Sequence, residues 1–125
     1  MTTTDRDLLE RAAKAAGYTL KWGDVYMVGG DEVDCSDQPY VVSGQPDEAD
    51  WYWNPLEDDG DEARLEAACN IDIEWHTIGV VAILNDKDLI HNTERFRETF
   101  ADHGGDKQKA RRYAGTRAAA AMGGE

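Results

Sequence analysis

Apolar residues recur at helical spacing near both ends of the chain. Leu8, Ala12 and Ala16 are spaced four residues apart, and Gly17 follows at the position where many helices end. Alanine dominates the apolar positions of residues 107–122, and two glycines come directly after this segment. Both segments are therefore predicted to be helices with one apolar face.

A third helix and four strands are predicted between these two helices. Residues 63–69 are rich in alanine and leucine and follow a run of acids, which favours the N-terminal end of a helix. Alternating or continuous apolar residues predict strands over residues 18–22, 25–28, 71–75 and 77–84. The predicted order of elements is α-β-β-α-β-β-α.

Two stretches carry no regular pattern. Residues 31–50 contain two prolines and a glycine and are predicted to be irregular, with room for one short strand over 40–42. Residues 89–100 have scattered apolar positions and are predicted to be a loop with one short element. The expected fold class is α+β, with residues 1–125 as a single domain in which helices pack on a single antiparallel sheet.

The charge of the chain is concentrated in one third of its length. Of the 125 residues, 26 are acidic and 13 are basic, which gives a formal net charge of −13. Residues 22–63 contain half of the acids and no Lys or Arg, so the rest of the chain sums to zero. A protein this acidic is a poor candidate for binding nucleic acid or an anionic membrane through its overall charge. Its apolar runs reach about eight residues, too short to span a bilayer.

The acidic stretch has two interpretations. Charge of one sign keeps a protein soluble, and solvation alone would account for it. The other interpretation is an interface for a basic protein or ribonucleoprotein complex, because aromatic residues lie among the acids and can serve as buried anchors. The candidate partner-binding residues are Asp31, Glu32, Asp34, Asp37, Tyr40, Asp47, Glu48, Asp50 and Trp51.

The sequence offers little enzyme chemistry. His76, His91 and His103 are too widely spaced for a His-x-x-x-His pattern, so no zinc site is predicted. Cys35 lies among acids, which raise the pKa of a thiol, and Cys69 falls on a predicted helix as a buried residue. No phosphate-binding loop, dinucleotide fingerprint or Gly-x-Ser-x-Gly motif occurs. We therefore expect a protein that is not an enzyme and that uses no cofactor and no metal.

A central motif resembles a group of phage proteins. Residues 53–61 read Trp-Asn-Pro-Leu-Glu-Asp-Asp-Gly-Asp and lie between the alanine-rich segments 7–17 and 114–123. This arrangement is similar to small bacteriophage and prophage proteins of unknown function with a WNPL-x-DDGD signature, and more loosely to phage domains described as an ABA sandwich. The resemblance implies a phage origin, a compact α/β sandwich and no catalytic residues. A phage origin is compatible with an anti-CRISPR or other anti-defence protein.

The same motif has a structural interpretation. Trp53 would anchor the core or its rim, Pro55 would set the start of a helix, and Asp58 or Asp59 would cap that helix. The alternative is a divalent metal ion bound by Asp58, Asp59 and Asp61. These residues lack the further ligands of a calcium-binding loop.

Three functions are compatible with these patterns. The leading hypothesis is a phage-encoded acidic protein that works in the host cytoplasm. It would inhibit a CRISPR-type defence complex by occupying a basic nucleic-acid-binding surface. The alternative is a non-enzymatic phage structural or assembly accessory that self-associates through its apolar helix faces. The third is direct binding of nucleic acid by the five bases of residues 107–117, which the net charge disfavours.

Overall fold

The computed structural model describes residues 3–23, 25–34, 36, 38–42, 49–85 and 93–123. The helices are α1 (Thr3–Ala15), α2 (Asp59–Cys69) and α3 (Lys107–Gly123), with a 3-10 turn, η1 (Ala101–His103), before α3. The strands are β1 (Thr19–Trp22), β2 (Val25–Val28), β3 (Asp31–Asp34), β4 (Pro39–Val42), β5 (Trp51–Tyr52), β6 (Ile71–Trp75), β7 (Gly79–Asn85) and β8 (Thr93–Thr99). No helix in these ranges is long and apolar enough to cross a membrane.

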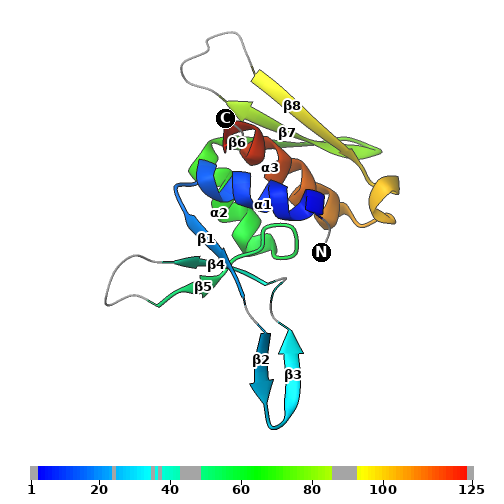
Figure 1. The fold of residues 1–125 in the computed structure, drawn as a ribbon. Coiled ribbons are helices and arrows are strands. Elements are labelled where there is room, and N and C mark those ends of the chain that lie inside the picture. Colours follow the sequence, from blue (N-terminus) through cyan, green and yellow to red (C-terminus); the bar gives the residue numbers. More distant parts are fainter. Residues whose placement is uncertain are drawn as a thin grey trace.

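The two terminal helices, α1 and α3, lie against each other in the middle of the molecule (Figure 1). Leu9 and Ala12 of α1 are fully buried, as are Ala114 and Ala118 of α3. Small side chains let two helices approach closely. α2 packs beside α3 and adds Leu65 to the same core. The apolar faces predicted for the two terminal segments are therefore used inside the molecule.

The strands form three small antiparallel sheets, so the predicted single sheet is wrong. β4 pairs with both β1 and β5, whereas β2 and β3 pair with each other. β6, β7 and β8 form the third sheet, and α3 packs against one of its faces (Figure 1). The prediction assumed that strands adjacent in sequence share one sheet. Inserting a hairpin between two paired strands costs little loop entropy, and no local pattern reveals it.

The predicted order of elements is also wrong. Among the described residues, five strands lie between α1 and α2, and three lie between α2 and α3. The short strand allowed over residues 40–42 is present as β4, whereas residues 31–34, predicted to be irregular, form β3. The sequence of β3 is Asp-Glu-Val-Asp, and acidic residues have low strand propensity, so this strand gives almost no signal.

The segment predicted to be a loop with a short element contains β8, which pairs with β7 along its whole length. Phe96 is the apolar residue of β8 and packs against the core, with the guanidinium carbon of Arg117 5.8 Å from its ring centre. Glu98 points to the same side and lies 3.5 Å from Arg117. A strand whose inner face carries charged residues is missed by a search for hydrophobic alternation.

The start of α2 agrees with the structural interpretation of the motif. Trp53 is only 1% exposed and is the largest fully buried side chain in the described chain. Asp58 is the N-cap, because its Oδ2 accepts a hydrogen bond from the backbone N–H of Asp61 at 2.9 Å. Asn70 ends the helix in the left-handed conformation, with φ of 56°. The cap makes α2 begin at Asp59, earlier than the predicted start at residue 63.

Replacing Asp58 by alanine is expected to destabilise the protein by about 1 kcal/mol, the usual cost of losing an N-cap. Urea denaturation measures this change. Asp58→Asn is the matched control, because asparagine keeps an oxygen acceptor and loses only the charge. If asparagine is as harmful as alanine, the contribution of Asp58 is its charge, 3.9 Å from Arg64, and the cap matters little.

Candidate functional site

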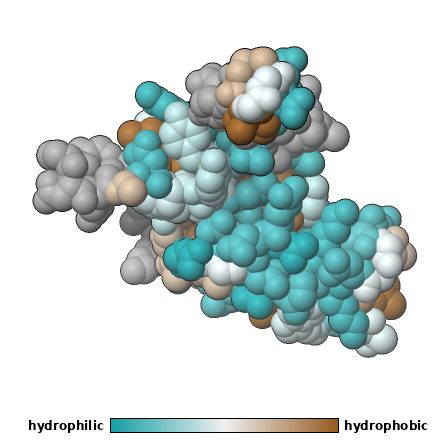
Figure 2. All heavy atoms as spheres, turned by 90° about the horizontal axis from the view of Figure 1, so that it is seen from below, coloured by the Kyte–Doolittle hydropathy of each residue, from teal (hydrophilic) through white to brown (hydrophobic). Residues whose placement is uncertain are grey.

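The β2–β3 hairpin projects from the body of the molecule (Figure 1). Its strands are joined by Gly29 and Gly30, whose φ angles are 60° and 89°. Two consecutive positive φ angles give the tight turn that matches the twist of a hairpin, and glycine adopts them without strain. Figure 2 views the molecule from this end, where the surface is mostly hydrophilic with small separate hydrophobic patches. The hairpin is thus a short arm with two sides open to solvent.

The register of the hairpin sorts its side chains into two faces. Met27 lies opposite Glu32, and Val28 lies opposite Asp31. Opposed residues share a face, as do residues two apart on one strand. One face therefore carries Met27, Glu32 and Asp34, and the other carries Val28, Asp31 and Val33. All six are exposed, with Met27 at 70% and Val28 at 61%. Each face thus offers at least one carboxylate beside an exposed apolar side chain.

Hydrogen bonds hold Asp34 of β3 in its charged form. Ser36 donates hydrogen bonds to Asp34 from its hydroxyl and from its backbone N–H, the latter at 2.9 Å, and these bonds lower the pKa of Asp34. Asp31 and Glu32 are exposed to solvent. Because no Lys or Arg occurs between Trp22 and Ala63, the hairpin itself carries no compensating base.

The other candidate partner-binding residues are not on the hairpin. Tyr40 is half-buried on β4, opposite Tyr52 of β5. Trp51 is 40% exposed on β5, and its ring meets that of Tyr18 edge-on at 5.9 Å. Asp50, just before β5, is exposed. The three residues Asp37, Asp47 and Glu48 lie outside the described residues. Among the described candidates, the structure thus brings together the three acids of β3, whereas Tyr40 and Trp51 lie on a separate sheet and Asp50 directly precedes it.

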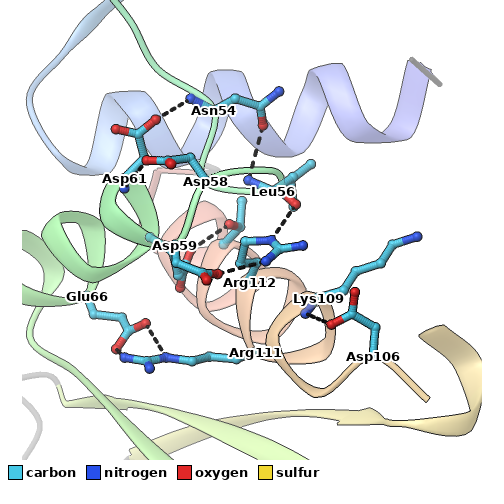
Figure 3. A network of polar contacts seen from close by, with 12 residues as sticks. Asn54, Leu56, Asp58, Asp59, Asp61, Glu66, Asp106, Lys109, Arg111 and Arg112 are labelled. Atoms are coloured by element: carbon cyan, nitrogen blue, oxygen red, sulfur yellow. Dashed lines mark hydrogen bonds and ion pairs between the residues drawn. The ribbon is translucent and has the colours of Figure 1, made fainter. Parts of the chain in front are cut away.

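The acids of the central motif hold the fold together. Asp59 pairs with Arg112 at 2.7 Å, and Arg112 also donates to the backbone oxygen of Leu56 at 2.9 Å (Figure 3). Asp61 accepts the backbone N–H of Asn54 at 2.9 Å and pairs with Arg64 at 2.6 Å. These bonds tie the motif to α3 and to the start of α2. In the described part of the chain, no group of three His, Cys, Asp or Glu side chains is arranged to bind a metal ion.

A pocket of about 640 Å3 lies beside this motif and was not predicted from the sequence. Tyr52, which is 70% exposed, lines it together with Glu57, Asp58, Asp61 and Arg64. Three carboxylates against one guanidinium give it a net negative charge. The pairing of β4 with β5 forms part of the pocket wall, and the sequence does not reveal this pairing. The run of acids was therefore the only sequence signal that could have indicated the pocket.

The pocket lining is connected to the residue that follows β1. Gln38 lines the pocket, and its backbone oxygen accepts a hydrogen bond of 3.0 Å from the N–H of Gly23, the residue directly after β1. A negative surface of this kind with an exposed aromatic ring suits a cationic group.

A second polar cluster is buried between α2 and α3. Glu62 is 1% exposed, and its Oε2 accepts a hydrogen bond from the Thr116 hydroxyl at 3.0 Å. Burial, and then the charge of Glu66, raise the pKa of Glu62 to about 10. Glu66 itself is paired through two hydrogen bonds, of 2.9 and 3.1 Å, with Arg111 (Figure 3). Glu62 is thus neutral at neutral pH and closed to solvent, so this cluster is structural.

The chain was compared with protein-family models, curated proteins and solved structures, and it matches none of them. The similarity to phage proteins with a WNPL-x-DDGD signature remains a prediction from the motif alone. The function has to be argued from the geometry of the acidic surface.

Proposed function

We propose that the protein acts by binding, and that its hairpin docks on a basic, nucleic-acid-binding surface of a partner. The observation that carries the proposal is the exposure of Asp31 and Glu32 on an arm that also exposes Met27 and Val28. Carboxylates on the arm attract the Lys and Arg side chains that would otherwise contact phosphates. A partner occupied in this way no longer has that surface free for nucleic acid.

The charged and apolar residues of the hairpin have different roles in this proposal. Charges on a protruding arm mainly speed encounter and exclude acidic partners. Affinity depends more on apolar side chains that lose water at the centre of the contact, and Met27 and Val28 are placed beside the acids for that. The pocket lined by Tyr52 and Glu57 offers a second position for a basic side chain of the same partner.

The partner class follows from the resemblance to phage proteins. A host ribonucleoprotein of the CRISPR type exposes long basic channels, and we propose such a complex in the host cytoplasm as the target. A phage accessory that self-associates through apolar helix faces has less support, because the apolar faces of α1 and α3 pack against each other.

The test is a charge reversal on the hairpin. The tagged protein and its Asp31→Lys, Glu32→Lys variant are used to capture partners from a bacterial lysate, and mass spectrometry identifies what is bound. We expect the unmodified chain to retain a basic nucleic-acid-binding protein that releases its labelled DNA or RNA when the chain is added. The variant should bind that partner at least roughly tenfold more weakly.

The control carries the same change of charge elsewhere. Glu94 and Asp102 are exposed and lie away from the hairpin, and the variant Glu94→Lys, Asp102→Lys should bind like the unmodified chain. Equal weakening by both variants would mean that binding follows net charge and not the hairpin. Retention of the partner by the hairpin variant would show that the proposal is wrong.

A further inference from the structure

The sheet of β6, β7 and β8 has one face turned away from the helices. Val80 and Ala82 of β7 point to the opposite face and are part of the core. In Figure 1 the helices lie on the core side of this sheet. The outer face carries an acidic row on β6, an aliphatic row on β7 and a basic row on β8. The members of these rows are Asp72 and Glu74, Val81 and Ile83, and Arg95 and Arg97.

The rows are aligned by the register of the strands. Asp72 lies opposite Ile83, which lies opposite Arg95. In the same way, Glu74 lies opposite Val81, which lies opposite Arg97. Each of these two sets of three residues therefore runs across the strands from an acid through an aliphatic residue to a base. The four charged residues are exposed, Val81 is covered to 2% exposure, and Ile83 is half-buried. This face is therefore neutral in sum and polarised across the strands, although Glu74 also lies 3.7 Å from Arg95 and 2.7 Å from His76 within the same copy.

We propose that a second copy of the chain docks on this face, related to the first by a two-fold axis parallel to β7. Rotation about such an axis exchanges the two edges of the sheet and keeps the direction of the strands. It places the acidic row of each copy over the basic row of the other, with the half-buried Ile83 of each copy facing its counterpart. Stacked sheets lie ~10 Å apart and stay aligned to within ~30°, which long charged side chains can bridge. The contact is the same on both copies, as a two-fold dimer requires.

The charge pattern selects this axis over the alternative. A two-fold axis lying across the strands would place acid over acid and base over base, which is repulsive. Ile78, in the turn between β6 and β7, is 73% exposed and borders a hollow of about 160 Å3 lined by Gly79 and Thr99. An axis parallel to the strands keeps this exposed side chain and the hollow at the same end of both copies.

The net charge of −13 does not oppose this contact. The excess of acids comes from residues 22–63, and the hairpin within that stretch lies at the far end of the molecule from this sheet (Figure 1). Two copies joined through their outer sheet faces therefore hold their acidic hairpins apart. The dimer does not depend on what the hairpin binds.

The experiment reverses the charge of one row in each of two variants. The acidic variant is Arg95→Glu, Arg97→Glu, and the basic variant is Asp72→Arg, Glu74→Arg. We expect the unmodified chain to have a mass of twice 13.9 kDa, both in analytical ultracentrifugation and in native mass spectrometry. Each variant alone has two rows of like charge and should be monomeric, with its dissociation constant raised at least roughly tenfold. A mixture of the two variants restores opposite charges across the contact and should give a dimer of one copy of each.

The mixture separates a lost interface from a lost fold. A variant that does not fold cannot be rescued by mixing, and circular dichroism of each variant checks its secondary structure. The pairing of the two variants should weaken in high salt, because it depends on exposed charges. The proposal is overturned if the unmodified chain is a monomer at every concentration reached, if either variant alone stays dimeric, or if two folded variants do not pair.

Discussion

Replacing Gly115 by alanine is expected to destabilise the protein by about 2–3 kcal/mol, the usual cost of overpacking a core. Gly115 lies on α3 where the helix faces α2, and a Cβ atom there would collide with the carboxyl group of Glu62. Glu62 is buried and cannot move into solvent. An alanine in a helix normally stabilises by up to ~1 kcal/mol over glycine. The sign of the change therefore tests the packing directly, and urea denaturation measures it.

A double-mutant cycle provides the control for this prediction. In a chain that already carries Glu62→Ala, the collision is absent, and Gly115→Ala should be neutral or stabilising. The two substitutions should therefore be coupled by about 2 kcal/mol or more, at the upper end of what neighbouring residues show. An equal loss in both backgrounds would place the cost of Gly115→Ala somewhere other than Glu62.

Glu62→Gln is expected to remove a large pH dependence of stability. The pKa of Glu62 is raised from an ordinary value of 4.5 to about 10 in the folded protein. Between these values the folded chain holds a proton that the unfolded chain has lost, so rising pH favours unfolding. A single group of this kind lowers the free energy of unfolding by up to about 1.4 kcal/mol for each unit by which the pH rises. Glutamine keeps the shape and the bond from Thr116 but does not titrate.

The measurement is the free energy of unfolding of both chains from about pH 6 to about pH 8. The difference in favour of Glu62→Gln should grow by up to about 2.5 kcal/mol across this range. Asp102→Asn, which removes a carboxyl group at an exposed position, is the matched control for the loss of one acid. Parallel curves for Glu62→Gln and the parent would show that Glu62 is ionised in the folded protein.

Local signals in the sequence were enough to predict the three helices and the cap of α2, although the predicted helix began four residues too late. Spacing of apolar residues depends only on one segment, as does the cap formed by Asp58, so both can be read without knowing the rest of the fold. The burial of Trp53 followed from the same motif. The buried acid Glu62 was not anticipated, because its environment is made by Gly115 and Thr116 on a distant helix.

Pairing between strands was beyond what the sequence reveals. β1 pairs with β4 across the inserted hairpin, and β8 has one apolar residue, Phe96, on a face otherwise made of charged side chains. The acidic stretch was recognised from composition, but composition does not say which acids project. The structure separates the exposed acids of β3 from Asp59 and Asp61, which are bonded into the core of the motif.

The hairpin that carries Asp31 and Glu32 is separate from the residues that stabilise the fold. Among the described elements, β2 and β3 make extensive contact only with each other. Substitutions there leave the helical core untouched and are cheap in stability, whereas most substitutions in a core are costly. Under the proposed function, selection can therefore change what this arm binds by small steps without passing through unfolded intermediates. Binding by the hairpin and folding of the helical core would then evolve at different rates.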